Sequence, residues 1–320
     1  MSSLIEVRHL TKEYRTKNNT VIHPVTDVSF AVNEGETVGL AGESGCGKST
    51  LARLMIRIIK PTSGSVLWKG KEISSLPEKE FLQYRRKIQF IFQDPYASLN
   101  PRMPIRDIIA EPLETYRIYA SEKETTGRVI ELLKAVGLDE DALYRYPHQF
   151  SGGQRQRIGI ARALGPKPEL LILDEPVSAL DISVQNQILN LLRSLRKELH
   201  FSCFFISHDL SVVRHVSDRI FVMFLGKICE TGPEKDVFAQ PLHPYTYFLM
   251  KAHPLPDPHA RDKKKEILAG EVPSPSSLPD GCLFHTRCPF AKEKCKTAAP
   301  EMKTFGNRQV LCHYPLRDSL

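Results

Sequence analysis

The stretch from Gly42 to Ser49 reads G-E-S-G-C-G-K-S and fits the phosphate-binding loop pattern G-x-x-x-x-G-K-[ST]. Residues 36–41 before it are mostly apolar and β-prone, whereas residues 50–55 begin a helical pattern. This strand–loop–helix order is the context that the motif requires. Its glycines allow backbone N–H groups to point into one anion-binding cradle, and the following helix adds its positive dipole end. The sequence therefore predicts a site for a nucleoside triphosphate.

Each residue of this loop has an expected role. Lys48 would reach the β- and γ-phosphates, and the Ser49 hydroxyl would ligate Mg²⁺. The alternative for the segment, a glycine-rich turn before a helix, is disfavoured by the context. The other predicted nucleotide contacts are Gly42, Glu43, Ser44, Gly45, Cys46, Gly47 and Thr50.

Composition narrows the class of protein. The chain has 320 residues, 41% of them hydrophobic and 25% charged, as in ordinary soluble globular proteins. Its apolar runs have the length of strands and fall short of the ~18 residues that a membrane helix needs. Residues 1–6 lack the basic and apolar regions of a secretory signal. We therefore expect a cytosolic protein, and docking on a membrane protein stays open.

The positive charge does not indicate a nucleic-acid partner. The formal net charge of +7 is a modest excess that is spread along the chain. Its densest run, residues 261–265, has no aromatic residues between its charges that would stack on bases. We interpret this run as a solvated linker and expect no nucleic-acid binding.

The order of predicted elements indicates an α/β fold. Residues 4–41 hold short β-prone runs without helices between them, which suggests a small antiparallel β subdomain. Residues 105–164 show helical periodicity, and strands return at 170–173, 203–206 and 220–223. Strands that alternate with helices predict a parallel core sheet that is covered on both faces. The helical stretch is then a subdomain inserted between two strands of that sheet.

A change in composition marks a second region. Prolines become frequent beyond about residue 250 and break regular structure, and a cysteine-rich tail follows. We predict a nucleotide-binding domain over residues 1–250, with its helical subdomain at about 94–164, and a C-terminal cysteine-rich extension over 251–320.

An acidic motif fits the predicted nucleotide site. Residues 170–173 are aliphatic, and Asp174 and Glu175 follow them directly. A strand buried on both faces would deliver these carboxylates to the C-terminal edge of the sheet, where ligands bind. We expect Asp174 to hold Mg²⁺ and Glu175 to act as the general base for the water that attacks the γ-phosphate.

Residues 151–154, Ser-Gly-Gly-Gln, precede a predicted helix and form a second candidate anion site. The Ser can cap the helix, and the glycines leave its N–H groups accessible. With this pairing of one phosphate loop and a second phosphate-binding helix end, the sequence strongly resembles the ATP-binding subunits of ABC transporters, which are P-loop NTPases. The resemblance implies that two subunits sandwich ATP. The signature of one subunit meets the phosphate loop of the other, and here it is Ser151, Gly152, Gly153 and Gln154, with Phe150 replacing the usual Leu.

Further motifs of that family appear in order along the chain. By resemblance, Gln93 is the Q-loop glutamine that senses Mg²⁺ and the attacking water, Asp181 belongs to the D-loop, and His208 is the switch histidine that contacts the γ-phosphate. Tyr14 has the position of the aromatic that stacks on adenine, and a core tyrosine is its alternative. The resemblance implies ATP hydrolysis with ATP and Mg²⁺. It implies Glu175 and His208 as the catalytic residues, and Ser49 and Gln93 as ligands of Mg²⁺.

Segments outside these motifs resemble the oligopeptide/dipeptide importer subfamily, and the resemblance covers essentially the whole chain. They are residues 93–102, 146–148 and 241–246, and the likeness is closest to the second of the two non-identical ATPases of such importers. It implies import of di- or oligopeptides, with nickel or other metal complexes and glutathione as alternative cargo.

The same resemblance implies partners and a location. The partners are a paralogous ATP-binding subunit in a heterodimer, two transmembrane permease subunits and an extracytoplasmic solute-binding protein. The chain would lie at the cytoplasmic face of the bacterial inner membrane. Residues 95–102 would receive a coupling helix of the membrane subunit, and a proline-rich loop without a partner is the alternative.

Two other classes of nucleotide-binding protein fit less well. Soluble ATPases of the same superfamily act in DNA repair or translation, but the sequence has neither a long heptad insertion nor a second phosphate loop. A GTPase switch would leave the signature at 151–154 unexplained.

Four of the seven cysteines lie close together near the C-terminus: Cys282, Cys288, Cys295 and Cys312. A reducing cytosol disfavours disulfides, and the spacing lacks the short C-x₂₋₄-C pair of most zinc sites. We therefore predict a [4Fe–4S] cluster that staples the tail, as similar tails of peptide-importer ATPases carry. Zinc is the alternative metal, with His285 and His313 as substitute ligands. The cysteines expected to be structural are Cys46, Cys203 and Cys229.

Overall fold

The chain forms two units, each assembled from segments that are distant in sequence. The computed structural model describes residues 2–16, 18–252 and 273–316. The first unit contains residues 76–206 and the short segment 33–36, and the second contains residues 3–32, 37–75 and the chain from 207 onward. The predicted linker run 261–265 lies outside the described residues.

The first unit contains three parallel strands, β6 (Ile88–Ile91), β7 (Leu170–Asp174) and β8 (Ser202–Ser207). β7 pairs with β6 on one side and with β8 on the other. Every residue of β7 and β8 is buried, whereas β6 buries only its two end residues. The aliphatic sequence of β7 therefore belongs to a strand that is covered on both faces.

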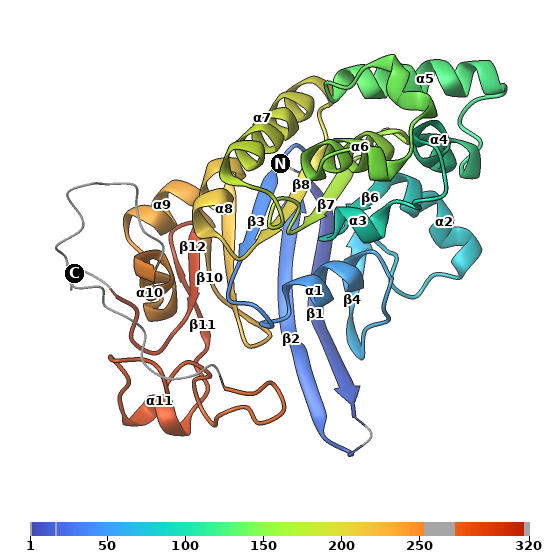
Figure 1. Cartoon of the computed structure of the whole chain (residues 1–320). Coiled ribbons are helices and arrows are strands. Elements are labelled where there is room, and N and C mark those ends of the chain that lie inside the picture. The colour runs from blue at the N-terminus through green and yellow to red at the C-terminus, as the bar shows by residue number, and fades with distance from the viewer. Residues whose placement is uncertain (1, 17, 253–272, 317–320) are drawn as a thin grey trace. The chain divides into compact units, whose positions relative to one another are not determined.

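Helices make up most of the rest of this unit. Helices α4, α5 and α6 pack against one another and lie together in Figure 1, where they are drawn in green. Each contributes fully buried apolar side chains, such as Ile109, Leu133 and Ile158. The helices are α2 (Glu78–Lys87), α3 (Pro95–Ser98), α4 (Ile105–Thr115), α5 (Glu122–Ala135), α6 (Gly152–Leu164) and α7 (Ile182–Leu199), with 3-10 turns at Glu140–Tyr144 and Pro147–Gln149.

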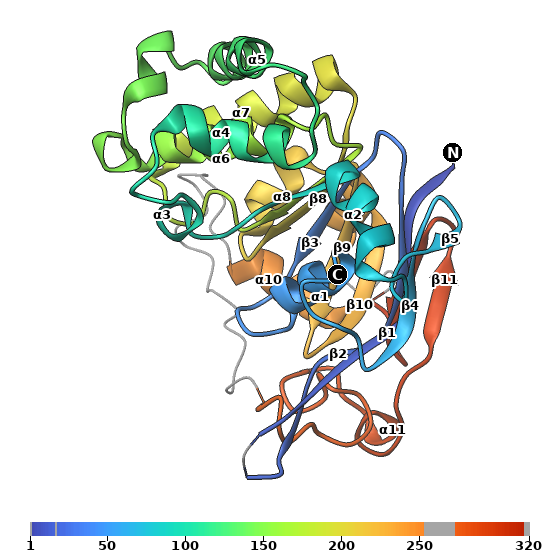
Figure 2. The same ribbon diagram turned by 90° about the vertical axis from the view of Figure 1, so that its right-hand side faces the viewer.

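The second unit contains an antiparallel sheet in the order β2-β1-β4-β5. β1 (Ser3–Arg15) and β2 (Val21–Asn33) are its long neighbours, as Figures 1 and 2 show. β4 (Ser63–Trp68) pairs antiparallel with β1 and with β5 (Lys71–Glu72).

The other strands of this unit form a mixed arrangement, whereas the helix alternation in the sequence predicted parallel strands. β3 (Thr37–Ala41) pairs parallel with β9 (Arg219–Phe224), and antiparallel pairs then link β9 to β10 (Lys227–Pro233), β10 to β12 (Arg308–Leu311) and β12 to β11 (Met302–Phe305). The change of direction has a local cause. Leu225 and Gly226, between β9 and β10, both have positive φ, 42° and 81°, as a tight two-residue hairpin turn requires.

Residues near the C-terminus share a hydrophobic core with the rest of the second unit. The ring of Tyr245 packs on those of Phe224 and Phe284, with centroids 4.7 and 5.4 Å away. The helices of this unit are α1 (Lys48–Met55), α8 (Leu210–Val216), α9 (Glu234–Ala239), α10 (Pro244–Ala252) and α11 (Glu293–Thr297). Across the described residues, no helix has both the length and the apolar character needed to cross a membrane.

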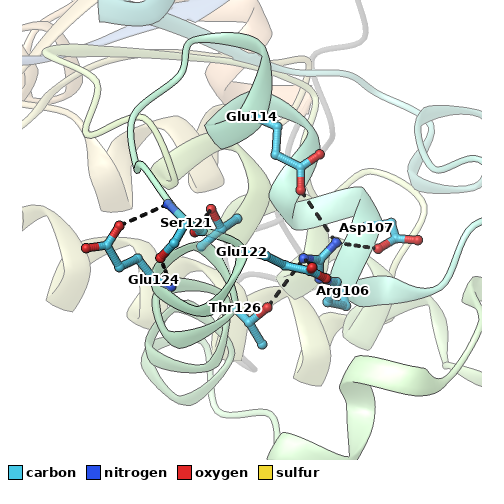
Figure 3. A network of polar contacts seen from close by, with 8 residues as sticks. Arg106, Asp107, Glu114, Ser121, Glu122, Glu124 and Thr126 are labelled. Atoms are coloured by element: carbon cyan, nitrogen blue, oxygen red, sulfur yellow. Dashed lines mark hydrogen bonds and ion pairs between the residues drawn. The ribbon is translucent and has the colours of Figure 1, made fainter.

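The corner between α4 and α5 carries a polar network (Figure 3). Ser121 caps α5 by accepting a hydrogen bond from the Glu124 N–H at 3.3 Å, and the Glu124 side chain accepts one from the Ser121 N–H. Arg106 of α4 binds Asp107 at 2.9 Å and Glu122 of α5 at 3.0 Å. Hydrogen bonding to Asp107 raises the pKa of Arg106. The corner is thus held by charges at the surface.

Candidate nucleotide site

The predicted phosphate loop connects β3 to α1 within the second unit. β3 is buried throughout, and α1 begins at Lys48. Gly47, the residue before α1, has φ 109°, and a Cβ added there would lie 1.8 Å from the Pro24 carbonyl oxygen. Only glycine fits this close approach. The loop is therefore fixed at the point where the chain enters the helix.

Lys48 lies inside the curve of this loop. Its buried Nζ donates hydrogen bonds to the carbonyl oxygens of Gly42 at 2.7 Å and Glu43 at 3.0 Å. Ser44 and Gly45 are exposed at the tip, whereas Cys46 is buried, and burial raises the pKa of its thiol. The loop thus combines an enclosed ammonium group with an open tip, an arrangement that suits an anionic ligand.

Two residues far along the chain hold the loop at Glu43. The Glu43 N–H donates to the hydroxyl oxygen of Tyr245 at 2.9 Å. The guanidinium of Arg287 donates to both carboxylate oxygens of Glu43, at 2.8 and 3.1 Å. Sequence reasoning missed both contacts. Tyr245 lies in the importer-like segment 241–246, which gave a weak signal, but nothing in the spacing pointed to Arg287.

The predicted acidic pair lies in the first unit, at the end of β7. Asp174 and Glu175 are both buried, and the Glu175 N–H donates to the Ile206 carbonyl oxygen at 3.0 Å. Glu175 has φ 48°, a left-handed conformation that costs a non-glycine residue about 1–2 kcal/mol. Gln93 donates from Nε2 to a carboxylate oxygen of Glu175 at 3.3 Å. The structure therefore brings together the glutamine and the carboxylate that were predicted to act on the same water.

The predicted signature begins α6 in the same unit. Ser151 accepts a hydrogen bond from the Gln154 N–H at 3.3 Å, and the Gln154 side chain accepts one from the Ser151 N–H at 3.0 Å. Asp181 likewise caps α7 by accepting from the Val184 N–H at 3.0 Å, and this bond lowers the pKa of Asp181. A Cβ on Gly153 would lie 2.4 Å from a Val184 methyl carbon, so this glycine also permits the approach of α7.

Two other predicted residues lie in the second unit. Tyr14 of β1 is 40% exposed, and the Lys12 Nζ lies 4.9 Å from its ring centroid. The ring is therefore not part of the core, which removes the alternative of a core tyrosine. His208 is exposed and directly precedes Asp209, the N-cap of α8.

The segment predicted to meet a membrane subunit contains α3. Tyr96 is exposed there, and the guanidinium of Arg155 lies 3.9 Å from its ring centroid. Arg162 donates to the Ser98 carbonyl oxygen at 2.8 Å, and burial lowers the pKa of Arg162. Both arginines come from α6, so the segment that follows Gln93 is tied to the signature helix.

The predicted iron–sulfur cluster is wrong. In the described part of the chain, no group of three or more His, Cys, Asp or Glu side chains is arranged to hold a metal ion. Burial raises the pKa of the Cys282 thiol, and it raises that of Cys288 to about 11 and that of Cys312 to about 12. All seven cysteines are free of disulfides.

The four C-terminal cysteines pack as small apolar side chains instead, although all border one small cavity. Cys282 and Cys295 belong to the core cluster of Tyr245 and Phe284, with Cys288 packed against it, and Cys312 joins a second cluster with Leu242 and Val310. The zinc alternative has no support either: His285 and His313 each bond a backbone carbonyl oxygen through one ring nitrogen, and among the described residues neither belongs to a group arranged to hold a metal ion.

Comparison with known proteins agrees with this geometry. The family model described as "ABC transporter" matches residues 25–178, and the one described as "Oligopeptide/dipeptide transporter, C-terminal region" matches residues 229–295. The putative oligopeptide transport ATP-binding protein YkfD of Bacillus subtilis is 51% identical over 97% of this chain and 95% of its own length. The oligopeptide transport ATP-binding protein OppF of Escherichia coli is 48% identical over 97% of this chain and 95% of its own length.

Solved structures agree as well. The post-hydrolysis dimer of the ATP-binding cassette MJ0796, bound to ADP and Pi, matches with a TM-score of 0.66 at 32% identity, over 72% of this chain and 98% of that one. The fold is accordingly the α/β fold of ABC ATPases. The chain belongs to the family of ABC transporter ATPases and carries the C-terminal region found in oligopeptide and dipeptide transporters.

Proposed function

We propose that this chain hydrolyses ATP to power the import of di- or oligopeptides through a membrane permease. The observation that carries the proposal is the hydrogen bond between Gln93 and Glu175, which holds the candidate general base beside a group able to orient water. The names of relatives about half identical over nearly the whole chain support peptides as the cargo.

The roles of individual residues follow from their chemistry. Lys48 would stabilise the charge that develops on the transferred phosphoryl group. Ser49, Asp174 and Gln93 are the residues that would hold Mg²⁺, which would supply further positive charge there. Glu175 accepts a proton from the attacking water, and His208 contacts the γ-phosphate. Tyr14 stacks on adenine. In trans, the signature of residues 151–154 binds the nucleotide on the loop of a second subunit, and Asp181 of the D-loop lies at that dimer interface.

The proposed setting is the cytoplasmic face of the bacterial inner membrane. The partners are a paralogous ATP-binding subunit, two permease subunits and an extracytoplasmic solute-binding protein. Residues 95–102, which include the exposed Tyr96, receive the permease. We assign residues 1–250 to the ATPase domain, with its antiparallel β subdomain and a helical subdomain at about 94–164, and residues 251–320 to the C-terminal extension.

Glu175→Gln tests the catalytic assignment. The amide keeps the shape of the side chain and its hydrogen bond to Gln93 but cannot accept the proton of water. We expect ATP binding to stay near wild type while turnover falls by about 10²–10⁴-fold. The measurement pairs nucleotide titration with phosphate release in the complex purified from native membranes. Near-normal turnover in the variant would remove Glu175 from the mechanism.

The same purification tests the transport assignment. Recovery of a second ATPase, two multi-span subunits and a solute-binding protein is the expected result. Recovery of the chain only as a soluble dimer would contradict the proposal.

A further inference from the structure

We propose that Arg287 is a positioning residue for nucleotide binding, which acts by holding and neutralising Glu43 of the phosphate loop. The inference rests on the proposed function only in that the loop is taken to bind ATP. Arg287 belongs to the C-terminal region matched over residues 229–295, far from the loop in sequence.

The geometry of this contact is specific. Both terminal nitrogens of Arg287 bind the two oxygens of one carboxylate, at 2.8 and 3.1 Å, in the bidentate form that fixes orientation as well as distance. The Arg287 side chain is only 7% exposed, compared with 28% for Glu43. Its Nε has no hydrogen-bond partner among the described residues, so the Glu43 carboxylate is the acceptor that compensates this buried cation.

The charge of Glu43 explains why the contact matters for an anionic ligand. Glu43 lies between Gly42, whose carbonyl oxygen binds Lys48, and the exposed loop tip. A free carboxylate there would repel a triphosphate, because like charges a few ångströms apart interact unfavourably even with solvent nearby. Arg287 cancels that charge and directs the carboxylate toward the C-terminal region.

A second anchor at the same residue supports the assignment. The Tyr245 hydroxyl accepts the hydrogen bond of the Glu43 N–H at 2.9 Å, and Tyr245 packs on Phe284, three positions before Arg287. Burial raises the pKa of Tyr245, so its hydroxyl stays neutral. Backbone and side chain of Glu43 are therefore both held from outside the region that matches the ABC transporter model, residues 25–178. The C-terminal region thus sets the geometry of the loop.

The test is a double-mutant cycle on the purified full-length chain, with a fluorescent ATP analogue and Mg²⁺ as the probe. Arg287→Ala leaves Glu43 unpaired, and we expect the Kd for the analogue to rise roughly tenfold. Adding Glu43→Gln to that variant removes the repelling charge and should return the Kd to within about threefold of wild type. A double variant as weak as Arg287→Ala alone would overturn the proposal, and so would an unchanged Kd in Arg287→Ala.

A matched control separates positioning from general stability. Arg308→Ala breaks another buried ion pair of the same unit, with Glu230, whose described hydrogen bonds go to Leu242, His243 and Arg308 and not to residues 42–49. It should lower the urea midpoint and leave the Kd unchanged, and a Kd that rises as much as in Arg287→Ala would reduce Arg287 to a structural residue. Should Arg287→Ala not fold, Arg287→Gln removes the charge with a smaller loss of side-chain volume, and an unchanged Kd in that variant would overturn the proposal.

Lys48→Ala separates a failure of the proposed function from a failure of the role assigned to Arg287. If wild type does not bind the analogue, or if Lys48→Ala binds as well as wild type, the proposed function fails. If Lys48→Ala abolishes binding while Arg287→Ala does not weaken it, only the role of Arg287 fails.

Discussion

Two arginines, one in each unit, pair with carboxylates in opposite environments, one exposed to solvent and the other buried. Arg106 at the α4–α5 corner binds carboxylates that reach solvent, such as Glu122, which is 83% exposed. Arg308 binds Glu230, which is fully buried, at 2.7 Å. Water can replace the partners of Arg106, but nothing can replace Glu230. The same chemical pair is therefore worth little at one site, whereas its disruption is costly at the other.

The Glu230 carboxylate also binds backbone groups. Its carboxylate accepts the N–H groups of Leu242 and His243, at 2.8 and 2.9 Å, in addition to the guanidinium of Arg308. Through these bonds one side chain of β10 connects β12 and the residues that lead into α10.

Glu230→Ala should have the largest effect. It removes the carboxylate partner of a buried guanidinium, which keeps the Gln240 carbonyl oxygen, and leaves two buried N–H groups without their acceptor. We expect a loss of about 3–5 kcal/mol in the free energy of unfolding. Urea denaturation followed by circular dichroism measures the change. Glu293→Ala, which removes the exposed pair with Lys296, is the matched control and should cost less than ~1 kcal/mol. Equal losses in the two variants would contradict the contrast.

Acidification should destabilise the region around His243. Burial lowers the pKa of His243 from 6.5 to about 4, and its Nδ1 accepts a hydrogen bond from the Tyr245 N–H. Between about pH 6.5 and 4 the unfolded chain binds this proton and the folded chain does not. Stability therefore falls as the pH drops through this window, by at most ~1.4 kcal/mol per pH unit, and this residue adds no slope above it.

The measurement for His243 is urea denaturation at pH 7.5, 6.5 and 5.5, with His243→Asn as the reference. Asn keeps a hydrogen-bond acceptor but does not titrate. The difference in unfolding free energy between the two chains should shrink as the pH falls. A difference that stays constant over this range would mean that His243 takes up its proton at the same pH in the folded and the unfolded chain, so that burial does not lower its pKa.

Ser121→Ala should have a smaller effect, because the capping box of α5 lies at the surface (Figure 3). Loss of the cap should cost ~1 kcal/mol. Ser121→Thr keeps the oxygen that accepts the Glu124 N–H and should stay within ~0.5 kcal/mol of wild type. Thermal unfolding of the two variants side by side decides whether the hydroxyl or the side-chain volume matters.

Arg106→Gln should have the smallest effect and the clearest salt dependence. We expect a loss of ~0.5–1 kcal/mol at low ionic strength, because the paired carboxylates are exposed. In 1 M NaCl the loss should largely vanish, since charges are screened within ~3 Å. The loss in Glu230→Ala should persist under the same conditions. A salt-independent loss in Arg106→Gln would place this arginine with the buried class.

Local signals in the sequence predicted the regular elements well. The aliphatic run at 170–173 is β7, Leu170–Asp174, and the strands predicted at 203–206 and 220–223 lie within β8, Ser202–Ser207, and β9, Arg219–Phe224. The loop at 42–49 lies between a buried strand and a helix, as its pattern required. Such features depend on residues that are adjacent in the sequence, so the sequence alone is enough to predict them.

Features that depend on distant contacts escaped prediction. The β9–β10 hairpin turns at Leu225 and Gly226, and a leucine with positive φ is not among the residues that usually mark such a turn. Glu43 and Arg287 are 244 positions apart, so neither reveals the other. The spacing of the four cysteines could not show that their thiols pack in two apolar clusters.

The position of Gly153 affects how genetic data on this protein should be interpreted. Any side chain there would meet a Val184 methyl group, so a substitution must shift Val184 or the contact between α6 and α7 whether or not nucleotide is present. A library scored by transport alone would record such variants as defects in nucleotide contact. Compensating changes to a smaller residue at position 184 would restore the helix spacing but not a lost ligand. Suppressor screens therefore provide a genetic means of separating the packing constraint on this glycine from its proposed contact with nucleotide.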